Sequence, residues 1–132
     1  MKRLFILLSI LVFSFNSFGK WDKLEGISNN EFAFYIHHES VKTVGKYVHF
    51  WSLKDNFKPT KGGTLSVKIR KQGDCNLNRV KPLSFIFYKK NMGKGSLDTY
   101  TPEESEWWYD PPGSIGSYEL AYVCEVVKLT GK

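Results

Sequence analysis

The C-terminal stretch PPGSIGSYELAYVCEVV, residues 111–127, decides the fold that this sequence of 132 residues predicts. Its opening indicates a turn followed by a helix, because the hydroxyl of Ser114 or Ser117 can accept a hydrogen bond from the free N–H groups of a first helical turn. Apolar positions then follow at i, i+3, i+4 and i+7 on one helical face: Leu120, Val123, Cys124 and Val127. We therefore expect a helix whose buried face carries one of the chain's two cysteines.

The N-terminal stretch MKRLFILLSILVFSFNSFG, residues 1–19, is typical of a secretory signal peptide. Lys2 and Arg3 precede an apolar run over residues 4–15, which is shorter than the roughly 20 residues that a membrane-spanning helix needs. We predict an exported protein with a single domain at residues 20–132, either periplasmic or secreted to the cell surface, and no stable membrane span after cleavage. An uncleaved anchor is the alternative. The stretch contains no cysteine, so the sequence does not predict a lipoprotein.

Export determines whether the two cysteines are expected to form a disulfide. Two cysteines in a small exported domain most often pair, so we predict a disulfide between Cys75 and Cys124. In the chain-entropy account, a bond closing a loop of that length stabilises the fold by about 4 kcal/mol. Two free, packed thiols remain the alternative. No further thiols or well-spaced histidines accompany the pair, which argues against a metal centre, and no cofactor is predicted.

The middle of the chain has the alternation of apolar and polar residues that antiparallel strands require. It is clearest in GTLSVKIRKQ, residues 63–72, where Leu65, Val67 and Ile69 alternate with Ser66, Lys68 and Arg70. EFAFYI (31–36) and GKYVHFWSLKD (45–55) also predict strands, and the latter, apolar on both faces, suits a central position. Residues 76–89 predict one long strand, or two joined at Pro82, where a bulge or a sheet edge is expected.

These elements predict an α+β fold. An antiparallel sheet of about five or six strands would carry one C-terminal helix on one face, tethered to it by the disulfide. The segment YTPEESEWWYDPPGS, residues 100–114, predicts an ordered loop in which Trp107 and Trp108 do not both point inward.

An ordered set of motifs resembles the bacterial surface-adhesin protein E family. The set consists of FYI (34–36), YVHFWSLKDNFKP (47–59), GDC (73–75), NRVKPLSFIFYKKNMGKG (78–95) and PPGSIGSYELAYVC (111–124). The resemblance implies an antiparallel sheet with a disulfide-tied C-terminal helix. It also implies export in a Gram-negative bacterium, and non-catalytic binding of extracellular proteins rather than enzymatic activity. Adhesins of the family resemble lipoproteins, whereas this chain lacks the cysteine, so a periplasmic accessory protein that binds an envelope component is the alternative.

The formal charge of +6 falls to +4 without Lys2 and Arg3, since 17 cations then face 13 acids. This balance favours anionic partners in general, and with export it argues against nucleic acid. The candidate ligand-binding residues are Lys68, Arg70, Arg79, Lys89 and Trp108. The partners that they suit are an extracellular protein, an anionic polysaccharide or another envelope component. An ordinary solvated face is the competing interpretation, and exposed strand edges make a homodimer compatible with the sequence.

Two chemical interpretations compete with binding. The acids Glu103, Glu104, Glu106 and Asp110 lie in one loop, and a suitably spaced pair would suit a small hydrolase. Consecutive loop acids are more often a solvated surface. His37, His38 and His49 suggest a metal site only weakly, because neighbouring residues of a strand point to opposite faces.

Overall fold

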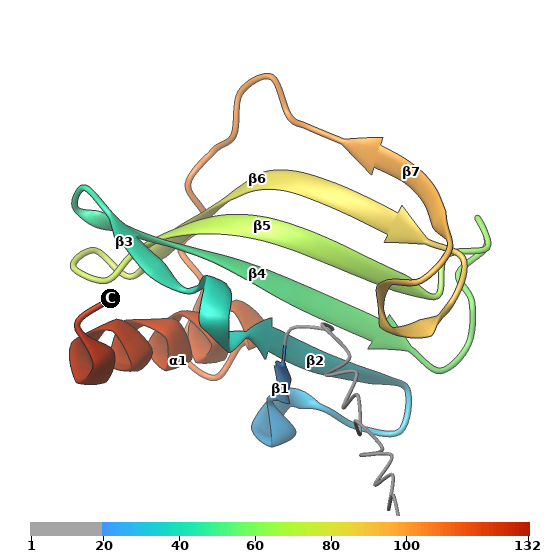
Figure 1. Ribbon diagram of the computed structural model, residues 1–132, viewed down its shortest axis with the longest axis horizontal. Coiled ribbons are helices and arrows are strands. Elements are labelled where there is room, and N and C mark those ends of the chain that lie inside the picture. Colours follow the sequence, from blue (N-terminus) through green and yellow to red (C-terminus); the bar gives the residue numbers. More distant parts are fainter. Residues whose placement is uncertain (1–19) are drawn as a thin grey trace, which may run out of the picture.

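A computed structural model describes residues 20–132 and shows a seven-stranded antiparallel sheet with one long helix packed against it (Figure 1). Residues 1–19, where the signal peptide is predicted, lie outside the described part of the chain. The strands are β1 (Trp21–Lys23), β2 (Phe32–His37), β3 (Lys42–Val44), β4 (Tyr47–Asn56), β5 (Ser66–Asp74), β6 (Arg79–Tyr88) and β7 (Ser96–Tyr100). The helix α1 spans Ile115–Thr130, and short 3-10 turns occur at η1 (Glu25–Ile27), η2 (His38–Ser40) and η3 (Asn91–Gly93). The predicted fold class is confirmed.

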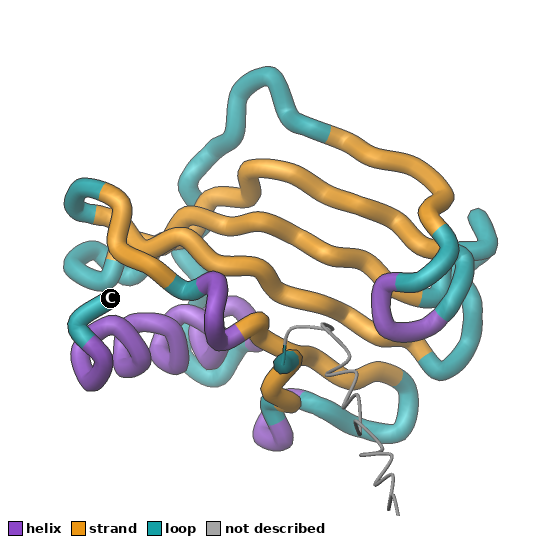
Figure 2. The backbone as a smooth tube through the Cα atoms, viewed as in Figure 1, coloured by secondary structure: helices purple, strands orange, loops and turns teal. Residues whose placement is uncertain are grey.

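The strand order is β1-β2-β4-β5-β6-β7, and β3 also pairs with β4 (Figure 2). β2 and β3 run along the same edge of β4, with η2 between them. The sheet has seven strands rather than the predicted five or six because three short strands give little sequence signal. β1 and β3 have three residues each, and all five residues of β7 are exposed.

The sheet has one face covered by α1, here called the helix face, and an opposite face, here called the far face. Paired residues on neighbouring strands share a face, and successive residues of a strand alternate between faces. The core of the helix face joins β2, β4 and β6 to α1 through Phe34, Ile36, Val48, Phe50, Val80, Leu120, Val123 and Val126. The far face carries the side chains of Tyr47, His49, Trp51, Lys68, Arg70, Gln72, Lys81, Ser84, Ile86 and Tyr88.

The helix begins where the sequence predicts. Ser114 is the N-cap, and its hydroxyl accepts a hydrogen bond from the N–H of Ser117 at 3.2 Å. The helix ends at Thr130 and is capped by Gly131, whose φ of 70° is favourable for glycine. The buried residues are Glu119, Leu120, Val123 and Val126, so the buried stripe is rotated slightly from the predicted one. Cys124 and Val127 lie at its border, partly buried against the core.

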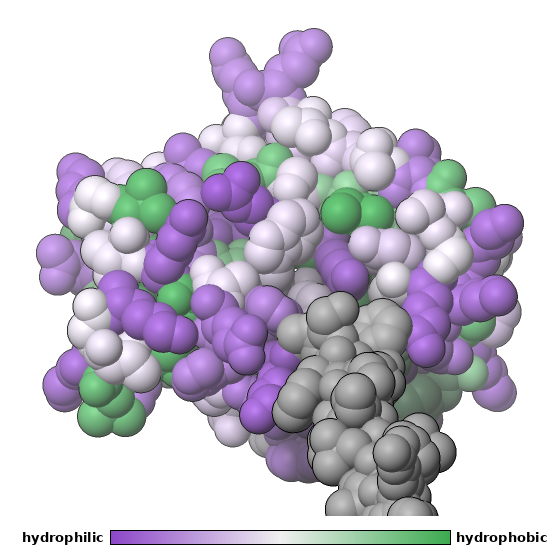
Figure 3. Space-filling model, in the orientation of Figure 1, coloured by the Kyte–Doolittle hydropathy of each residue, from purple (hydrophilic) through white to green (hydrophobic). Residues whose placement is uncertain are grey.

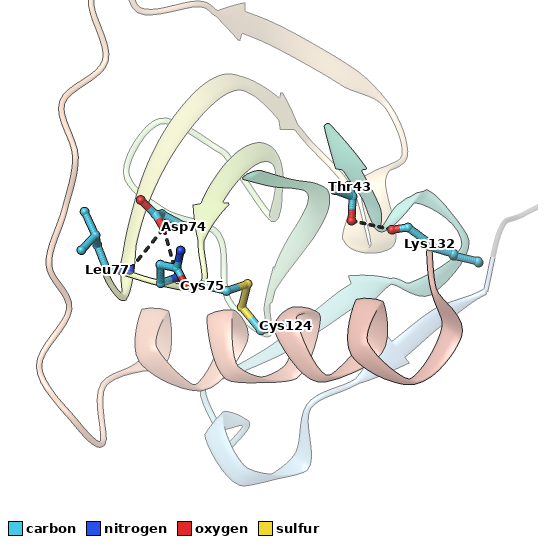
Figure 4. Close-up of a disulfide and its surroundings, with 7 residues drawn as sticks. Thr43, Asp74, Cys75, Leu77, Cys124 and Lys132 are labelled. Carbon is cyan, nitrogen blue, oxygen red and sulfur yellow. Dashed lines mark hydrogen bonds between the residues drawn. A yellow bond between two sulfur atoms is a disulfide. The ribbon is translucent and has the colours of Figure 1, made fainter. Parts of the chain in front are cut away.

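The disulfide between Cys75 and Cys124 links the β5–β6 turn to α1, with 5.9 Å between the Cα atoms (Figure 4). It spans 49 positions of sequence, and the described residues contain no free cysteine. Just before it, the Asp74 carboxylate accepts hydrogen bonds from the N–H groups of Asn76 and Leu77, which fixes the turn that presents Cys75. The predicted pairing is therefore confirmed, and the alternative of two free thiols is wrong.

A bulge interrupts β6 beside Pro82, as predicted. Arg70 pairs with Ser84 whereas Lys71 pairs with Pro82, so Leu83 is the extra residue. The even-numbered residues of β6 consequently change sides along the strand. Val80 contributes to the core of the helix face, whereas Ile86 lies on the far face opposite Lys68.

Candidate functional site

The far face carries a lysine that is enclosed by aromatic rings. The Lys68 Nζ lies 5.4 Å from the centroid of the Trp21 ring and 5.2 Å from that of Tyr88. Both distances are within the range of a cation–π contact. Gly93 of η3 packs against the aliphatic part of this lysine, and a Cβ atom at Gly93 would clash with Lys68 Cε. Residues from β1, β5, β6 and η3 therefore hold this one side chain.

Lys68 lies in a hollow of about 360 Å³ on this face. The hollow is lined by Trp21, His37, Ser40, Trp51, Lys68, Ile86 and Tyr88. Trp21 is itself oriented by an edge-on contact with His37, with the ring centroids 5.1 Å apart. The lining thus combines large apolar surfaces with one ammonium group and the polar atoms of His37 and Ser40.

In the part of the chain that the structure describes, no carboxylate pairs with Lys68. Within residues 20–132, no acidic side chain lies within 4.0 Å of the Lys68 ammonium. Burial of this side chain lowers the pKa of Lys68 from its ordinary value, because desolvation disfavours the charged form. The hollow therefore holds a partly desolvated cation, and the interactions that stabilise its charge are the cation–π contacts with Trp21 and Tyr88.

A second hollow of about 320 Å³ adjoins the first and shares Ser40 and Trp51 with it. Arg70 projects here beside His49, with 3.4 Å between the guanidinium and Nδ1 of the imidazole. The other ring nitrogen of His49 donates to the amide oxygen of Gln72 at 2.8 Å, which leaves Nδ1 as the acceptor for Arg70. The remaining lining residues are Glu39, Lys42 and Phe50, and Glu39 is the one acid among them.

Farther along the far face, two cations stack on Trp107. The Arg79 guanidinium lies 4.1 Å and the Lys81 Nζ 4.5 Å from the ring centroid. Tyr47 contacts the same indole, with 5.2 Å between the centroids. Arg79 also binds the Asp74 carboxylate at 2.9 Å. Burial opposes ionisation of Asp74, but its hydrogen bonds from backbone N–H groups and from Arg79 outweigh that effect and lower the pKa of the carboxyl.

The candidate residues from the sequence divide into two groups. Lys68, Arg70 and Arg79 all lie on the far face, as a cationic strip requires. Lys89 follows the end of β6 and is exposed, beside Gly95 rather than either hollow. Trp108 is 49% exposed and lines a separate hollow with Pro82, Phe85 and Tyr100. We therefore do not include Lys89 and Trp108 in the candidate site.

Sequence reasoning missed the aromatic half of the site. Trp21 is the second residue after the predicted signal peptide and lies in a strand of three residues, where no alternation marks its face. Trp107 is partly buried whereas Trp108 is exposed, which confirms that the two do not both point inward. The alternation of GTLSVKIRKQ did predict that Lys68 and Arg70 share a face. Only the three-dimensional structure shows the rings beside them.

The other chemical candidates do not converge on a site. Glu103, Glu104 and Glu106 are exposed in the loop before α1. His37 packs on Trp21, whereas His38 lies 3.5 Å from the Asp22 carboxylate. Within the described residues, no group of three or more His, Cys, Asp or Glu side chains is arranged to hold a metal ion.

The molecular surface is mainly polar in the orientation of Figure 3, where hydrophobic residues form small separate groups. Among residues 20–132, no helix has the length and apolar character needed to cross a membrane.

Comparison with known proteins identifies relatives of this architecture. Crystal form II of Haemophilus influenzae protein E has a TM-score of 0.57 and 19% identity, over 85% of this chain and 90% of that chain. Protein E from non-typeable Haemophilus influenzae gives a TM-score of 0.56 and 19% identity, over 83% of this chain and 78% of that chain. No curated protein matches the chain in sequence. These two structures share its fold.

The family assignment rests on the sequence match. The family model described as surface-adhesin protein E matches residues 21–125, which include all seven strands, both cysteines and most of α1. This chain therefore belongs to the surface-adhesin protein E family.

Proposed function

We propose that this protein is an exported, non-catalytic binding domain of the protein E type, and that its far face binds an anionic polysaccharide of the cell envelope or of the extracellular space. The single observation that carries this proposal is the repeated placement of cations on aromatic rings along one face. Lys68 contacts two rings, and Arg79 and Lys81 share a third. Arg70 lies between them on β5.

These cations are preorganised rather than merely exposed. A lysine or arginine held against a ring has lost part of its conformational freedom and part of its hydration before a ligand arrives. Within residues 20–132, no carboxylate lies within 4.0 Å of Lys68, Arg70 or Lys81. An anionic ligand would therefore replace water at these groups without having to displace an internal acid.

The spacing of these cations suits an extended ligand. Lys68, Arg70 and Gln72 follow one another on the same face of β5, and Lys81 pairs with Gln72. Same-face positions along a strand are roughly 7 Å apart, so the run from Lys68 to the Trp107 cluster is roughly 14 Å long. A polymer with regularly spaced negative charges matches such a run of cations.

Retention on immobilised heparin tests the binding proposal. The variant Lys68→Glu/Arg70→Glu should elute at much lower salt than the parent, because each reversal replaces an attraction by a repulsion. The matched control is Lys58→Glu/Lys128→Glu, which changes the net charge equally at exposed positions outside the far face. Equal loss of retention in the two variants would mean that net charge alone governs binding and would refute the far-face site.

Export and surface display need a separate test in cells. An antibody against the domain should bind intact cells if the protein is a surface adhesin, and should require release by osmotic shock if it is a periplasmic accessory protein. Recovery of the protein only in the cytoplasmic fraction would contradict both forms of the proposal.

A further inference from the structure

The hollow around Lys68 has a composition that selects among anionic ligands. We propose that it is a subsite for one carboxylated sugar unit of an acidic polysaccharide, an inference that rests on the proposed function and names its ligand class. The hollow measures about 360 Å³, toward the lower end of the range for small-molecule sites. That volume suits one or two sugar rings rather than a large ligand.

The residues that line the hollow suit both the apolar and the polar groups of such a sugar. A pyranose ring presents C–H surfaces, and the indole rings of Trp21 and Trp51 in the lining offer apolar surface for them. A carboxylate on the same ring needs one cation, and Lys68 supplies it from the same hollow. His37 and Ser40 add hydrogen-bonding atoms to the lining for hydroxyl groups.

The position of the ammonium is fixed before binding. The lysine stem packs against Gly93 of η3, and Nζ lies within cation–π distance of both the Trp21 and the Tyr88 ring. The Lys68 ammonium is already partly desolvated by burial. A carboxylate that binds in the hollow would therefore stabilise a charge that is poorly hydrated in the free protein. A preorganised cation of this kind favours an anion bound at one defined point.

Other anionic ligands use this lining less well. Inorganic phosphate has no apolar surface to place against the rings. An acidic peptide bound by strand addition needs an unpaired strand edge, whereas Trp51, Lys68 and Ile86 project from the interior strands β4, β5 and β6. The adjoining hollow with Arg70, Lys42 and His49 continues the same surface, so neighbouring units of one polymer chain would meet further donors.

Calorimetry with defined oligosaccharides tests the subsite. The probe is a hyaluronan hexasaccharide, in which glucuronic acid alternates with N-acetylglucosamine, and its comparison is the same hexasaccharide with the carboxylates reduced to alcohols. The test variant is Lys68→Met, which keeps the length of the side chain and removes its charge. The matched control is Lys54→Met, because Lys54 also stacks on a ring, 4.9 Å from the centroid of Phe32, but on the helix face.

The proposal expects the hexasaccharide to bind the parent protein and Lys54→Met alike, and to bind Lys68→Met about tenfold or more weakly, as the loss of a charged hydrogen bond predicts. The reduced hexasaccharide should bind the parent with a similar loss and should no longer distinguish Lys68→Met. Equal affinity of Lys68→Met and Lys54→Met for the hexasaccharide would overturn the subsite.

Failure of the subsite and failure of the far-face proposal give different results. Retention on heparin that depends on the far face, without binding of the hexasaccharide, would overturn the carboxylated-sugar subsite and leave the proposed function standing. Absence of binding to both ligands would overturn the proposed function and the subsite together.

Discussion

The Lys71 ammonium lies 2.7 Å from the Glu119 carboxylate, where β5 meets α1. The side chains are 12% and 2% exposed, so this ion pair is part of the interface between helix and sheet rather than of the surface. Lys71 is thereby separated from its neighbour Arg70, which points to the far face. The single strand β5 therefore supplies two cations with different roles: Lys71 stabilises the fold, and Arg70 belongs to the candidate binding site.

We expect Glu119→Ala to lower the free energy of unfolding by about 3–5 kcal/mol, because it leaves Lys71 buried without its partner. The double variant Glu119→Leu/Lys71→Met should recover most of that loss, since it removes both charges and keeps much of the volume. Urea denaturation of the two variants checks this, and equal instability would show that the ion pair is not the reason for the loss.

Removing the disulfide should destabilise the fold but leave ligand binding by the folded protein largely unchanged. Cys75→Ala/Cys124→Ala is expected to lower the free energy of unfolding by about 4 kcal/mol, from the entropy of the 49-position loop that the bond closes. Heparin retention of the folded fraction should persist, because neither cysteine lies on the far face. If retention disappeared while circular dichroism still showed the native fold, the disulfide would be part of the binding site itself.

Ionisation of Tyr122 should destabilise the fold at alkaline pH. Burial, followed by the hydrogen bond that its hydroxyl donates to Asp22 at 3.0 Å, raises the pKa of Tyr122 to about 12 from the ordinary 10.0. The stabilisation is complete below pH 10.0 and disappears as the pH rises through about 12. Tyr122→Phe should cost about 1 kcal/mol at neutral pH, and its stability should decline less over this interval. Parallel declines in parent and variant would contradict this assignment.

Lys68→Met should leave the free energy of unfolding equal or raised at neutral pH, although it removes a residue proposed to bind ligand. The pKa of Lys68 is lower in the folded state than its ordinary 10.5, so the parent gains stability as the pH rises toward 10.5. The advantage of Lys68→Met should therefore shrink over that interval. A large destabilisation at neutral pH, with Lys54→Met unaffected, would show that Lys68 is structural instead.

Much of the fold follows from local patterns. The spacing of Leu120 and Val123 predicts the helix, and of the two candidate caps Ser114 and Ser117 the structure uses Ser114. The two cysteines predict the link that positions it. Patterns of this kind depend on neighbours within one element, and a single sequence contains them in full.

The contacts that form the candidate site are not local. Trp21 reaches Lys68 although β2 and β4 separate their strands in the sheet, so no spacing in the sequence relates them. Burial of Glu119 is equally invisible, because a glutamate inside a helix normally faces solvent. Only the approach of Lys71 from β5 makes that position favourable.

The bond between Cys75 and Cys124 also encloses β6, β7 and the exposed residues around Glu103 and Glu104 within one covalent ring. Proteolytic cleavage of that loop would open the chain without releasing α1, because the two fragments would stay joined through sulfur. A nicked molecule should migrate as one band on a non-reducing gel and as two after reduction. In an exported protein, the disulfide would thus preserve the assembled domain after a cut that would otherwise divide it.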